Sequence, residues 1–399
     1  MKTFRTNSFI MLLAILAGMI LAPWAHSQDT TETHQVEKSY KAGKIDIAEM
    51  ERRVSTLMRR DDMVGLSIAI VEEGQLVHAK GYGRLKAGSR ARVSENTVFR
   101  WASLSKSVAA ATARLLVDDG HFTLDSPVQA YAPSVDMPDA DNLITLEDLL
   151  SHRTGIVRNA YDTRIEDGRD PKIIRASLAK LSNLCEPGTC HGYQNVLFDA
   201  VAEMTEMATD LPYKAVVNER IFEPLNMSSA TTTLEGLSRS SSWAKPHNRA
   251  GREISRVKKT YYRVPAAAGV NSSIVDMSKW MMAMMEGNHP NLPAHVREDL
   301  ITPRVWTPLE NRRMRYRYRA LSDAQYALGW RVYDYGGRKV VGHRGAVSGY
   351  RSHVMFDPEL KTGIAMMWNS DASRPNGLPL EIFDQVYKKP KRDWLRLSR

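Results

Sequence analysis

The sequence predicts an α/β protein of the α+β type, in which helices flank an antiparallel sheet built from both ends of the chain. Three observations support this fold class. Strand patterns occur early and again late in the 399 residues. One helical pattern precedes the first strands and another follows the last. Between the two groups of strands, apolar residues recur mainly at helical spacing, which predicts a helical region inserted over about residues 103–300.

The early elements are a helix and a hairpin. From Ile45 to Met58 the apolar positions fall mostly on one helical face. Gly65–Val71 is rich in β-forming residues, Glu72-Glu73-Gly74 indicates a turn, and Gln75–Tyr82 predicts the returning strand. The chain therefore opens with a helix that packs on antiparallel strands.

The middle of the chain has the periodicity of helices. Ala102–Asp119 predicts a helix that Gly120 ends. Thr145-Leu146-Glu147-Asp148 resembles a capping box, with Leu149 and Leu150 directly after it. Phe198–Met207 and Met277–Met285 are further apolar stretches at helical spacing.

Strand patterns return late. The predicted strands are Ala327–Tyr333, Arg338–Gly342, His353–Phe356 and Gly363–Trp368. Asp357-Pro358 indicates the turn between the last two. A final helix is predicted over Leu378–Lys388.

The first residues are typical of a signal peptide. Lys2 and Arg5 precede an apolar run from Phe9 to Ala22, and small residues follow in Ala25-His26-Ser27. A membrane anchor is the alternative, but the run is shorter than the roughly 20 residues of a spanning helix. We therefore expect a signal peptide over 1–27, a flexible segment over 28–43, one domain over 44–390 and a basic tail over 391–399. The mature protein would be periplasmic or secreted, without a membrane span.

The net charge of +10 is partly concentrated in two stretches. Arginines from Arg312 to Arg319 alternate with Tyr316 and Tyr318, and lysines gather around Lys388. Arginine beside tyrosine is compatible with nucleic-acid binding. For an exported protein we instead expect a solvated basic face and no nucleic-acid partner, with attraction to anionic cell-envelope polymers as a weaker alternative.

Two cysteines, Cys185 and Cys190, flank Glu-Pro-Gly-Thr. An oxidising compartment permits a disulfide across this turn, and two free thiols are the alternative. Two cysteines at this spacing do not form a tetrahedral metal site.

Four S-x-x-K tetrads occur, beginning at Ser103, Ser177, Ser242 and Ser255. A serine needs a base to become a nucleophile, and a lysine three residues later on a helix lies on the same face. Burial and nearby positive charge lower a lysine pKa, as this role requires. The spacing alone does not choose among the four tetrads.

The residues around the first tetrad carry a family resemblance. Phe99-Arg100-Trp101-Ala102-Ser103-Leu104-Ser105-Lys106-Ser107 resembles the nucleophile region of the serine β-lactamases and penicillin-binding proteins, in particular the class C branch. The similarity continues through Leu115–Pro127, Leu149–Gly155 and Pro187-Gly188-Thr189. Tyr193-Gln194-Asn195 resembles the second motif of the family, and Gly342-His343-Arg344-Gly345-Ala346 the third, with a strand expected to follow. The resemblance covers roughly residues 45–388.

The resemblance implies a role for each matching position. Ser103 would be acylated, and Lys106 would accept or relay its proton. Tyr193 would exchange protons with Ser103 and the leaving group, and Asn195 would orient Lys106 and the substrate amide. The backbone N–H groups of Ser103 and Ala346 would form the oxyanion hole.

The third motif departs from the class C pattern. Those enzymes carry Lys-Thr-Gly, where this chain has His343-Arg344-Gly345, which we expect to bind substrate. The change replaces a fixed charge with one expected to titrate near neutrality. Recognition of a substrate carboxylate would then pass to Arg344 or Arg351, or be weaker. We expect His152 to hold a loop, and leave the role of His191 open.

The sequence thus predicts an exported serine hydrolase that acts on a small-molecule or peptide substrate without a cofactor. The substrate would be a β-lactam, a D-amino-acid peptide or a small ester, with cell-wall peptidoglycan as a candidate partner. No G-x-S-x-G elbow, H-E-x-x-H, Walker A loop or dinucleotide glycine pattern occurs. The alternative from another class is a non-hydrolytic penicillin or peptidoglycan sensor with the same fold.

Overall fold

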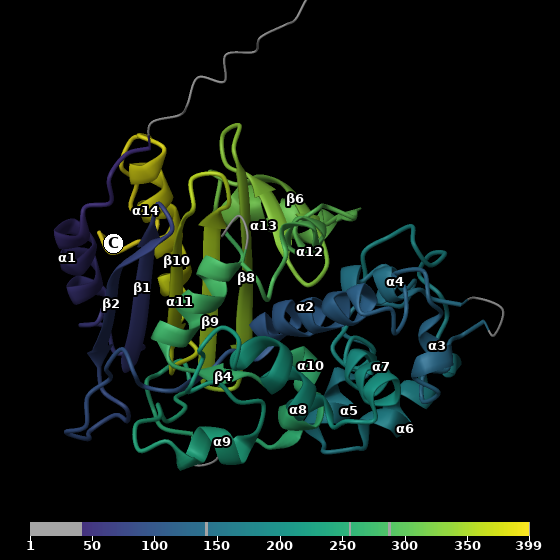
Figure 1. Ribbon diagram of the computed structural model, residues 1–399. Coiled ribbons are helices and arrows are strands. Elements are labelled where there is room, and N and C mark those ends of the chain that lie inside the picture. Colours follow the sequence, from purple (N-terminus) through teal and green to yellow (C-terminus); the bar gives the residue numbers. More distant parts are fainter. Residues whose placement is uncertain (1–41, 140–142, 255–256, 286–288, 399) are drawn as a thin grey trace, which may run out of the picture. The chain divides into compact units, whose positions relative to one another are not determined.

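An eight-stranded antiparallel sheet organises the protein, in the strand order β2-β1-β10-β9-β8-β7-β6-β5 (Figure 1). The computed structural model describes residues 42–139, 143–254, 257–285 and 289–398. The predicted signal peptide and most of segment 28–43 lie outside the described residues. Because β1 from the start of the chain pairs with β10 from its end, the predicted fold class is confirmed.

The ten strands are β1 (Gly65–Glu72), β2 (Gln75–Gly83), β3 (Phe99–Arg100), β4 (Asn271–Ser272), β5 (Val305–Trp306), β6 (Ser322–Tyr326), β7 (Arg331–Asp334), β8 (Lys339–Val347), β9 (Tyr350–Asp357) and β10 (Thr362–Trp368) among the described residues. The short strands β3 and β4 pair with each other in a separate two-stranded sheet. Strand β3 directly precedes the turn that carries Ser103.

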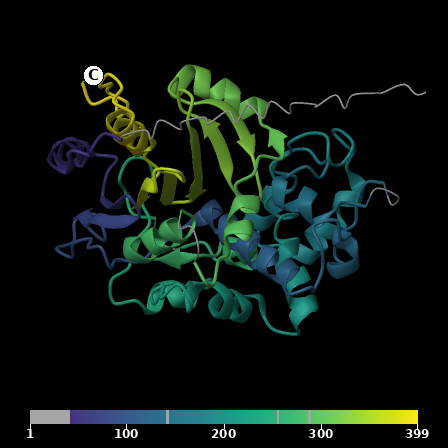
Figure 2. The same cartoon turned by 45° about the horizontal axis from the view of Figure 1, so that its top comes forward.

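The described α-helices are α1 (Ile47–Leu57), α2 (Ser105–Asp118), α3 (Val128–Tyr131), α4 (Leu146–Ser151), α5 (Asp162–Glu166), α6 (Pro171–Ala176), α7 (Ala200–Thr209), α8 (Tyr213–Val217), α9 (Leu234–Arg239), α10 (Pro265–Ala268), α11 (Ile274–Ala283), α12 (Ala294–Leu300), α13 (Pro308–Arg317) and α14 (Leu378–Val386). Short 3-10 turns are η1 (Ala102–Leu104), η2 (Leu178–Lys180), η4 (Thr260–Arg263) and η5 (Arg374–Gly377), and Asn218–Phe222 forms a π turn. Figures 1 and 2 both show α3–α8 gathered away from α1 and α14.

Each face of the sheet buries its own hydrophobic core. Successive side chains of a strand point to opposite faces, so β1 sends Ile68 and Ile70 to one core and Ala69 and Val71 to the other. The first core includes α1 and α14, and the second includes α2 and α11. The sheet is therefore covered on both sides.

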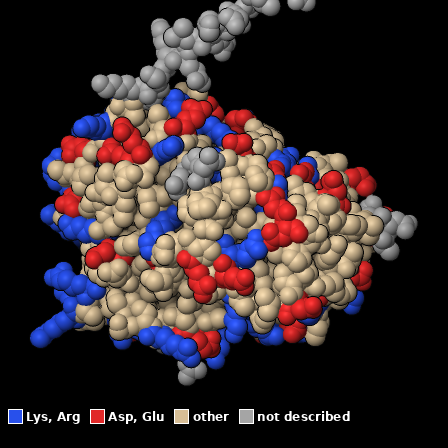
Figure 3. All heavy atoms as spheres, viewed as in Figure 1, with Lys and Arg blue, Asp and Glu red and all other residues tan. Residues whose placement is uncertain are grey.

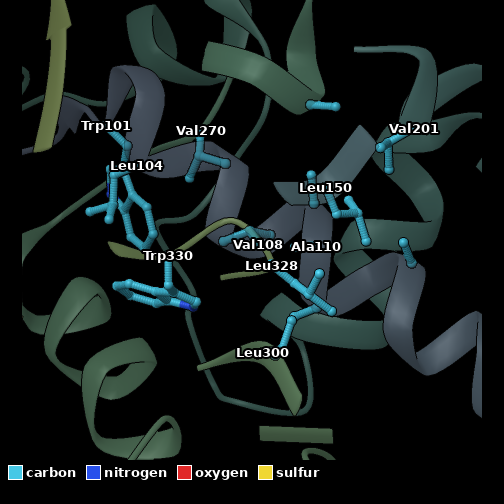
Figure 4. Packing of buried hydrophobic residues seen from close by; sticks show 14 of the residues in the cluster. Trp101, Leu104, Val108, Ala110, Leu150, Val201, Val270, Leu300, Leu328 and Trp330 are labelled. Atoms are coloured by element: carbon cyan, nitrogen blue, oxygen red, sulfur yellow. The ribbon is translucent and has the colours of Figure 1, made fainter. Parts of the chain in front are cut away.

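Helix α2 is the most enclosed helix near the site. All residues of α2 from Val108 to Ala113 are fully buried, on every side of the helix. Figure 4 shows Val108 and Ala110 of this helix near Leu328 and Trp330, which come from the far part of the chain. A helix buried in this way holds the residues at its start in a fixed position relative to the sheet.

The predicted strand Ala327–Tyr333 is wrong in its first half. Ala327 donates its N–H to the carbonyl of Trp330 across a turn, and β7 begins only at Arg331. Gly329 adopts φ +73° there, and an added Cβ would lie 2.6 Å from the carbonyl oxygen of Lys106. The apolar residues that suggest a strand instead pack this turn against α2.

Other boundaries agree with the sequence more closely. Thr145 and Asp148 form the predicted capping box at the start of α4. Strand β8 continues past Gly342 to Val347, so the third motif lies within a strand and not before one. Cys185 and Cys190 form a disulfide, so they are not the two free thiols of the alternative interpretation.

The end of the chain packs onto the domain. Leu395 is fully buried, and Asp393 pairs with Arg53 of α1. Among the described residues, no helix combines the length and apolarity that crossing a bilayer requires.

Replacing Trp330 with alanine tests the core behind the site. Trp330 is fully buried. Its ring centre lies 6.4 Å from that of the stacked Trp280 and 5.4 Å from that of Phe356, which it meets edge to face. Trp330→Ala should lower the free energy of unfolding by about 3–5 kcal/mol in urea titrations. Trp306→Ala is the matched control, because Trp306 is 51% exposed, and it should change stability by less than about 0.5 kcal/mol. Equal effects of the two changes would contradict this packing.

Candidate active site

One cleft of about 580 Å³ collects nearly all the predicted site residues. It lies where the start of α2, the segment before α7 and strand β8 meet. Its lining includes Ser103, Tyr193, Asn195, His343, Arg344, Gly345 and Ala346. Lys106 does not line the cleft but bonds to Asn195, which does.

Ser103 stands in a tight turn just before α2. The preceding residue, Ala102, has φ +52°, a backbone conformation that is costly for a residue with a Cβ. Ser105 Oγ accepts the N–H of Val270 at 2.9 Å and donates to the carbonyl of Ala102 at 2.7 Å. Such strain persists where the surroundings hold it, and here the bonds of Ser105 do so.

Strand β8 comes very close to the same turn. An added Cβ at Gly345 would overlap the carbonyl oxygen of Trp101. The hydroxyl of Ser352, on the neighbouring strand, donates to that carbonyl at 2.6 Å. Only a glycine leaves room for this approach, which puts Ala346 and Ser103 on the lining of one cleft.

Lys106 is fully buried below the cleft. Its Nζ donates to Asn195 Oδ1 at 2.7 Å and to the carbonyl of Ala267 at 3.1 Å, and lies 4.8 Å from the centre of the Tyr193 ring. Asn195 in turn donates to Asp162 Oδ2 at 2.7 Å. Burial raises the pKa of Asp162, although the bond from Asn195 opposes that shift. A chain of hydrogen bonds thus fixes the lysine and the asparagine together.

His152 accepts hydrogen bonds from the backbone on both sides of Tyr193. Its carbonyl accepts the N–H of Gly192 at 2.8 Å, and its Nδ1 accepts the N–H of Gln194 at 3.2 Å. The rings of His152 and Tyr193 lie 4.3 Å apart. Burial, then the charges of His191 and Lys106, lower the pKa of His152 well below its usual value, so Nδ1 stays free to accept.

His343 is buried at the back of the cleft, where its Nε2 hydrogen-bonds the hydroxyl of Tyr326 at 3.0 Å. Burial lowers its pKa well below the ordinary range, and the nearby charges of Arg331 and Lys106 act in the same direction. His191 also lines the cleft, and burial with the charge of Arg331 lowers its pKa to about 3. These histidines are neutral at neutral pH.

Residues 50–386 match the model of the Beta-lactamase family. The chain belongs to this family. The match includes every residue of the cleft and of the hydrogen-bonded chain below it.

Curated relatives are similar over much of the sequence. Unguisins hydrolase ungD of Aspergillus violaceofuscus is 25% identical over 81% of this chain and 61% of its own length. A D-aminopeptidase of Gluconobacter oxydans is 24% identical over 81% of this chain and 59% of its own length. The D-alanyl-D-alanine-carboxypeptidase/endopeptidase AmpH of Escherichia coli is 27% identical over 56% of this chain and 58% of its own. The chain spans about 60% of the length of these relatives, and they support a serine hydrolase at the level of the family.

Solved structures show the same fold. The octameric penicillin-binding protein homologue from Pyrococcus abyssi superposes with a TM-score of 0.77 at 23% identity, covering 86% of this chain and 78% of its own. The D-alanine carboxypeptidase AmpC from Burkholderia cenocepacia gives 0.67 at 19% identity, covering 86% and 97%.

The third family motif differs here in a way the sequence did not foretell. His343 was expected to titrate near neutrality, and this expectation is wrong because the side chain is buried beside two cations. The position that carries a lysine in class C enzymes thus holds an uncharged ring. His343 therefore offers no positive charge to attract a substrate anion.

The two arginines proposed to replace that charge are already paired. Arg344 forms an ion pair with Glu310, and Arg351 Nη1 lies 2.7 Å from Asp371 Oδ1. Burial opposes the charged form of Glu310, but Arg344, with other arginines, holds the pKa of Glu310 below its usual range. Both guanidiniums are therefore committed to carboxylates of the protein.

The sequence interpretation missed two kinds of cleft residue. Arg331 is a lone charge within the apolar stretch from Ala327 to Tyr333, a pattern that could have indicated a special role. Arg313 and Arg317 were read as part of a solvated basic face, but both also line the cleft from α13. On the face shown in Figure 3, acidic and basic side chains are interspersed, without one continuous basic surface.

The other tetrads lack a buried lysine. Lys180 of the Ser177 tetrad is exposed, and Lys245 of the Ser242 tetrad lies over the ring of Trp243. Ser255 lies outside the described residues. Among the residues described, no group of three or more His, Cys, Asp and Glu side chains is arranged to hold a metal ion.

The buried histidines predict acid sensitivity. Burial, with the charge of Arg344, lowers the pKa of His353 to about 3, close to that of His191. Below about pH 6.5 these histidines bind protons in the unfolded chain but stay neutral in the folded protein. The free energy of unfolding should therefore fall as the pH drops from about 6.5 towards 3. His353→Gln should flatten that fall by up to about 1.4 kcal/mol per pH unit, measured by urea unfolding at several pH values.

His121→Gln, at an exposed position, is the control for the substitution itself. An unchanged slope in His353→Gln would show that this histidine does not contribute to the acid sensitivity.

Proposed function

We propose that this protein is an exported serine hydrolase that cleaves an amide or ester through an acyl-enzyme on Ser103. The observation that carries the proposal is the position of Lys106. It is fully buried one helical turn after a serine that lines the cleft, and it is bonded to Asn195 next to Tyr193.

In the proposed acylation, Ser103 Oγ forms a bond to the substrate carbonyl carbon and gives its proton to the Lys106–Tyr193 pair. The carbonyl oxygen becomes an oxyanion, which the backbone N–H groups of Ser103 and Ala346 would stabilise. When the bond to the leaving group breaks, the leaving nitrogen or oxygen takes the proton through Tyr193. Asn195 would keep Lys106 in place throughout.

Water completes the proposed cycle. Its oxygen bonds to the acyl carbon, the bond from that carbon to Ser103 Oγ breaks, and one water proton returns to the serine oxygen. The products are the free acid and the original enzyme. His343, Arg344 and Gly345 would shape the part of the cleft that faces the acyl group.

We favour a peptide amide, with D-amino-acid peptides as the first candidates. The names of the D-aminopeptidase and the D-alanyl-D-alanine-carboxypeptidase support this class. The missing lysine in the third motif argues against efficient β-lactam hydrolysis, and small esters serve as test substrates. The disulfide between Cys185 and Cys190 supports export, because such bonds persist in oxidising compartments.

Ser103→Ala should abolish turnover. The change removes the nucleophile but little volume, so a panel of nitrocefin, D-alanyl peptides and p-nitrophenyl esters should lose more than about 10³-fold in rate. A fluorophosphonate should label the wild type at Ser103, as read by mass spectrometry, and should not label the variant. Ser177→Ala is the matched control and should keep wild-type rates. Loss of activity in Ser177→Ala alone would refute the assignment. A stable one-to-one adduct with a fluorescent penicillin and no turnover would instead indicate the sensor.

Lys106→Ala tests the base. Acylation should slow by about 10²–10⁴-fold, because a general base contributes on that scale. Stopped-flow acylation with a p-nitrophenyl ester measures it, and circular dichroism checks that the variant is folded. Unchanged acylation would mean that Tyr193 or another group accepts the proton.

A further inference from the structure

The cleft around Ser103 is rich in arginine. Its lining holds six arginines and, among the described residues, the single carboxylate of Glu310. The arginines are Arg158, Arg313, Arg317, Arg331, Arg344 and Arg351. Since the lining histidines are neutral, the cleft has a positive potential that favours anions.

Three of these arginines form ion pairs with carboxylates of the protein. Arg344 and Arg313 pair with Glu310, and Arg351 pairs with Asp371. They complete the walls of the cleft, and two carboxylates balance most of their charge. The attraction of the cleft for anions therefore comes mainly from the other arginines.

Arg331 differs from the paired arginines. It comes from the first residue of β7, and no carboxylate of the described residues forms an ion pair with it. Its Nη1 is buried without any hydrogen-bond partner. A guanidinium nitrogen that is removed from water without a hydrogen-bond partner costs free energy.

Two tyrosine rings compensate part of this cost. The guanidinium carbon lies 5.1 Å from the ring centre of Tyr326 and 5.8 Å from that of Tyr193. Burial disfavours the charged form of Arg331, but the carboxylate of Glu310 and the neighbouring tyrosines together outweigh it and raise the pKa of Arg331 above its ordinary value. Arg331 thus keeps its charge next to the tyrosine of the second motif, with hydrogen-bonding capacity left over.

We propose that Arg331 binds a carboxylate of the substrate, and that the Ser103 site therefore acts on anionic acyl compounds. This proposal rests on the proposed function and names its substrate class. The planar fork of a guanidinium matches a carboxylate in a bidentate pair. In this proposal Arg331 recognises the substrate carboxylate, the role expected from the sequence for Arg344 or Arg351.

Two exposed arginines add positive charge at the outer side of the cleft. Arg158 and Arg317 line the cleft from its surface side, and neither has an ion pair within the described part of the chain. Exposed charges attract an oppositely charged substrate over a distance of about one Debye length. The entry of an anionic substrate should therefore slow as salt is added.

The test compares two esters of similar length, mono-p-nitrophenyl succinate, which carries a carboxylate, and p-nitrophenyl butyrate, which is neutral. In the wild-type chain kcat/KM should favour the succinate by about tenfold or more, as a charge-assisted hydrogen bond provides. Arg331→Gln should bring the ratio close to one, and Arg331→Lys should retain part of the preference. Raising NaCl from about 0.05 to about 0.5 M should lower the wild-type ratio.

Arg315→Gln is the matched control. Arg315 is exposed on α13 and does not line the cleft, so its loss should leave the ratio unchanged. A wild-type ratio near one would overturn the proposal. So would an Arg331→Gln variant that slows both esters equally, because Arg331 would then act through Tyr193 and not on the substrate. The Arg331→Lys variant keeps the test informative if the glutamine variant does not fold.

A binding experiment separates this proposal from the proposed function. Saturation-transfer NMR on Ser103→Ala should detect succinamate but not neutral butyramide, and adding Arg331→Gln should abolish the succinamate signal. Binding lost in this way, together with turnover that does not depend on Ser103, would refute the proposed chemistry but keep the anion site. Equal signals from both amides would refute the anion site alone.

Discussion

The burial of the Lys106 amino group is the constraint on which the site depends. Taking such a polar group out of water costs free energy unless its hydrogen-bonding capacity is used. Asn195 and the carbonyl of Ala267 provide the partners, and Tyr193 provides a ring face. These groups come from segments far apart in the sequence, so satisfying one lysine also brings together the start of α2, the second motif and α10.

A positive charge on Lys106 also affects the protonation of its surroundings. Lys106 and Arg331 both disfavour protonation of His152 and His343, in addition to the burial of those rings. A neutral His152 can accept the N–H of Gln194 and so keep Tyr193 in position. The histidines in the site are therefore hydrogen-bonding groups, and in the proposed mechanism the proton transfers fall to Lys106 and Tyr193.

Much of this arrangement follows from local sequence. The order of the motifs, the capping box at Thr145 and the strand periods of β1 and β10 predict the elements and most of the cleft. Long-range partners are what the sequence hides. Arg344 meets a glutamate 34 residues earlier, and no local pattern announces that pair. The glycine turn at Gly329 was misjudged because its apolar neighbours pack against a helix and not in a strand.

Ion pairs between arginines and carboxylates of the protein hold several arginines in the wall of the cleft. Glu310 on α13 forms an ion pair with Arg344 of β8, and Asp371 forms one with Arg351 of β9. These ion pairs connect strands β8 and β9 to the neighbouring segments. A further carboxylate near Arg331 would balance that arginine in the same way and would leave nothing for a ligand. Among the described residues no carboxylate forms an ion pair with Arg331, so a bound anion would add a partner that the protein itself does not provide.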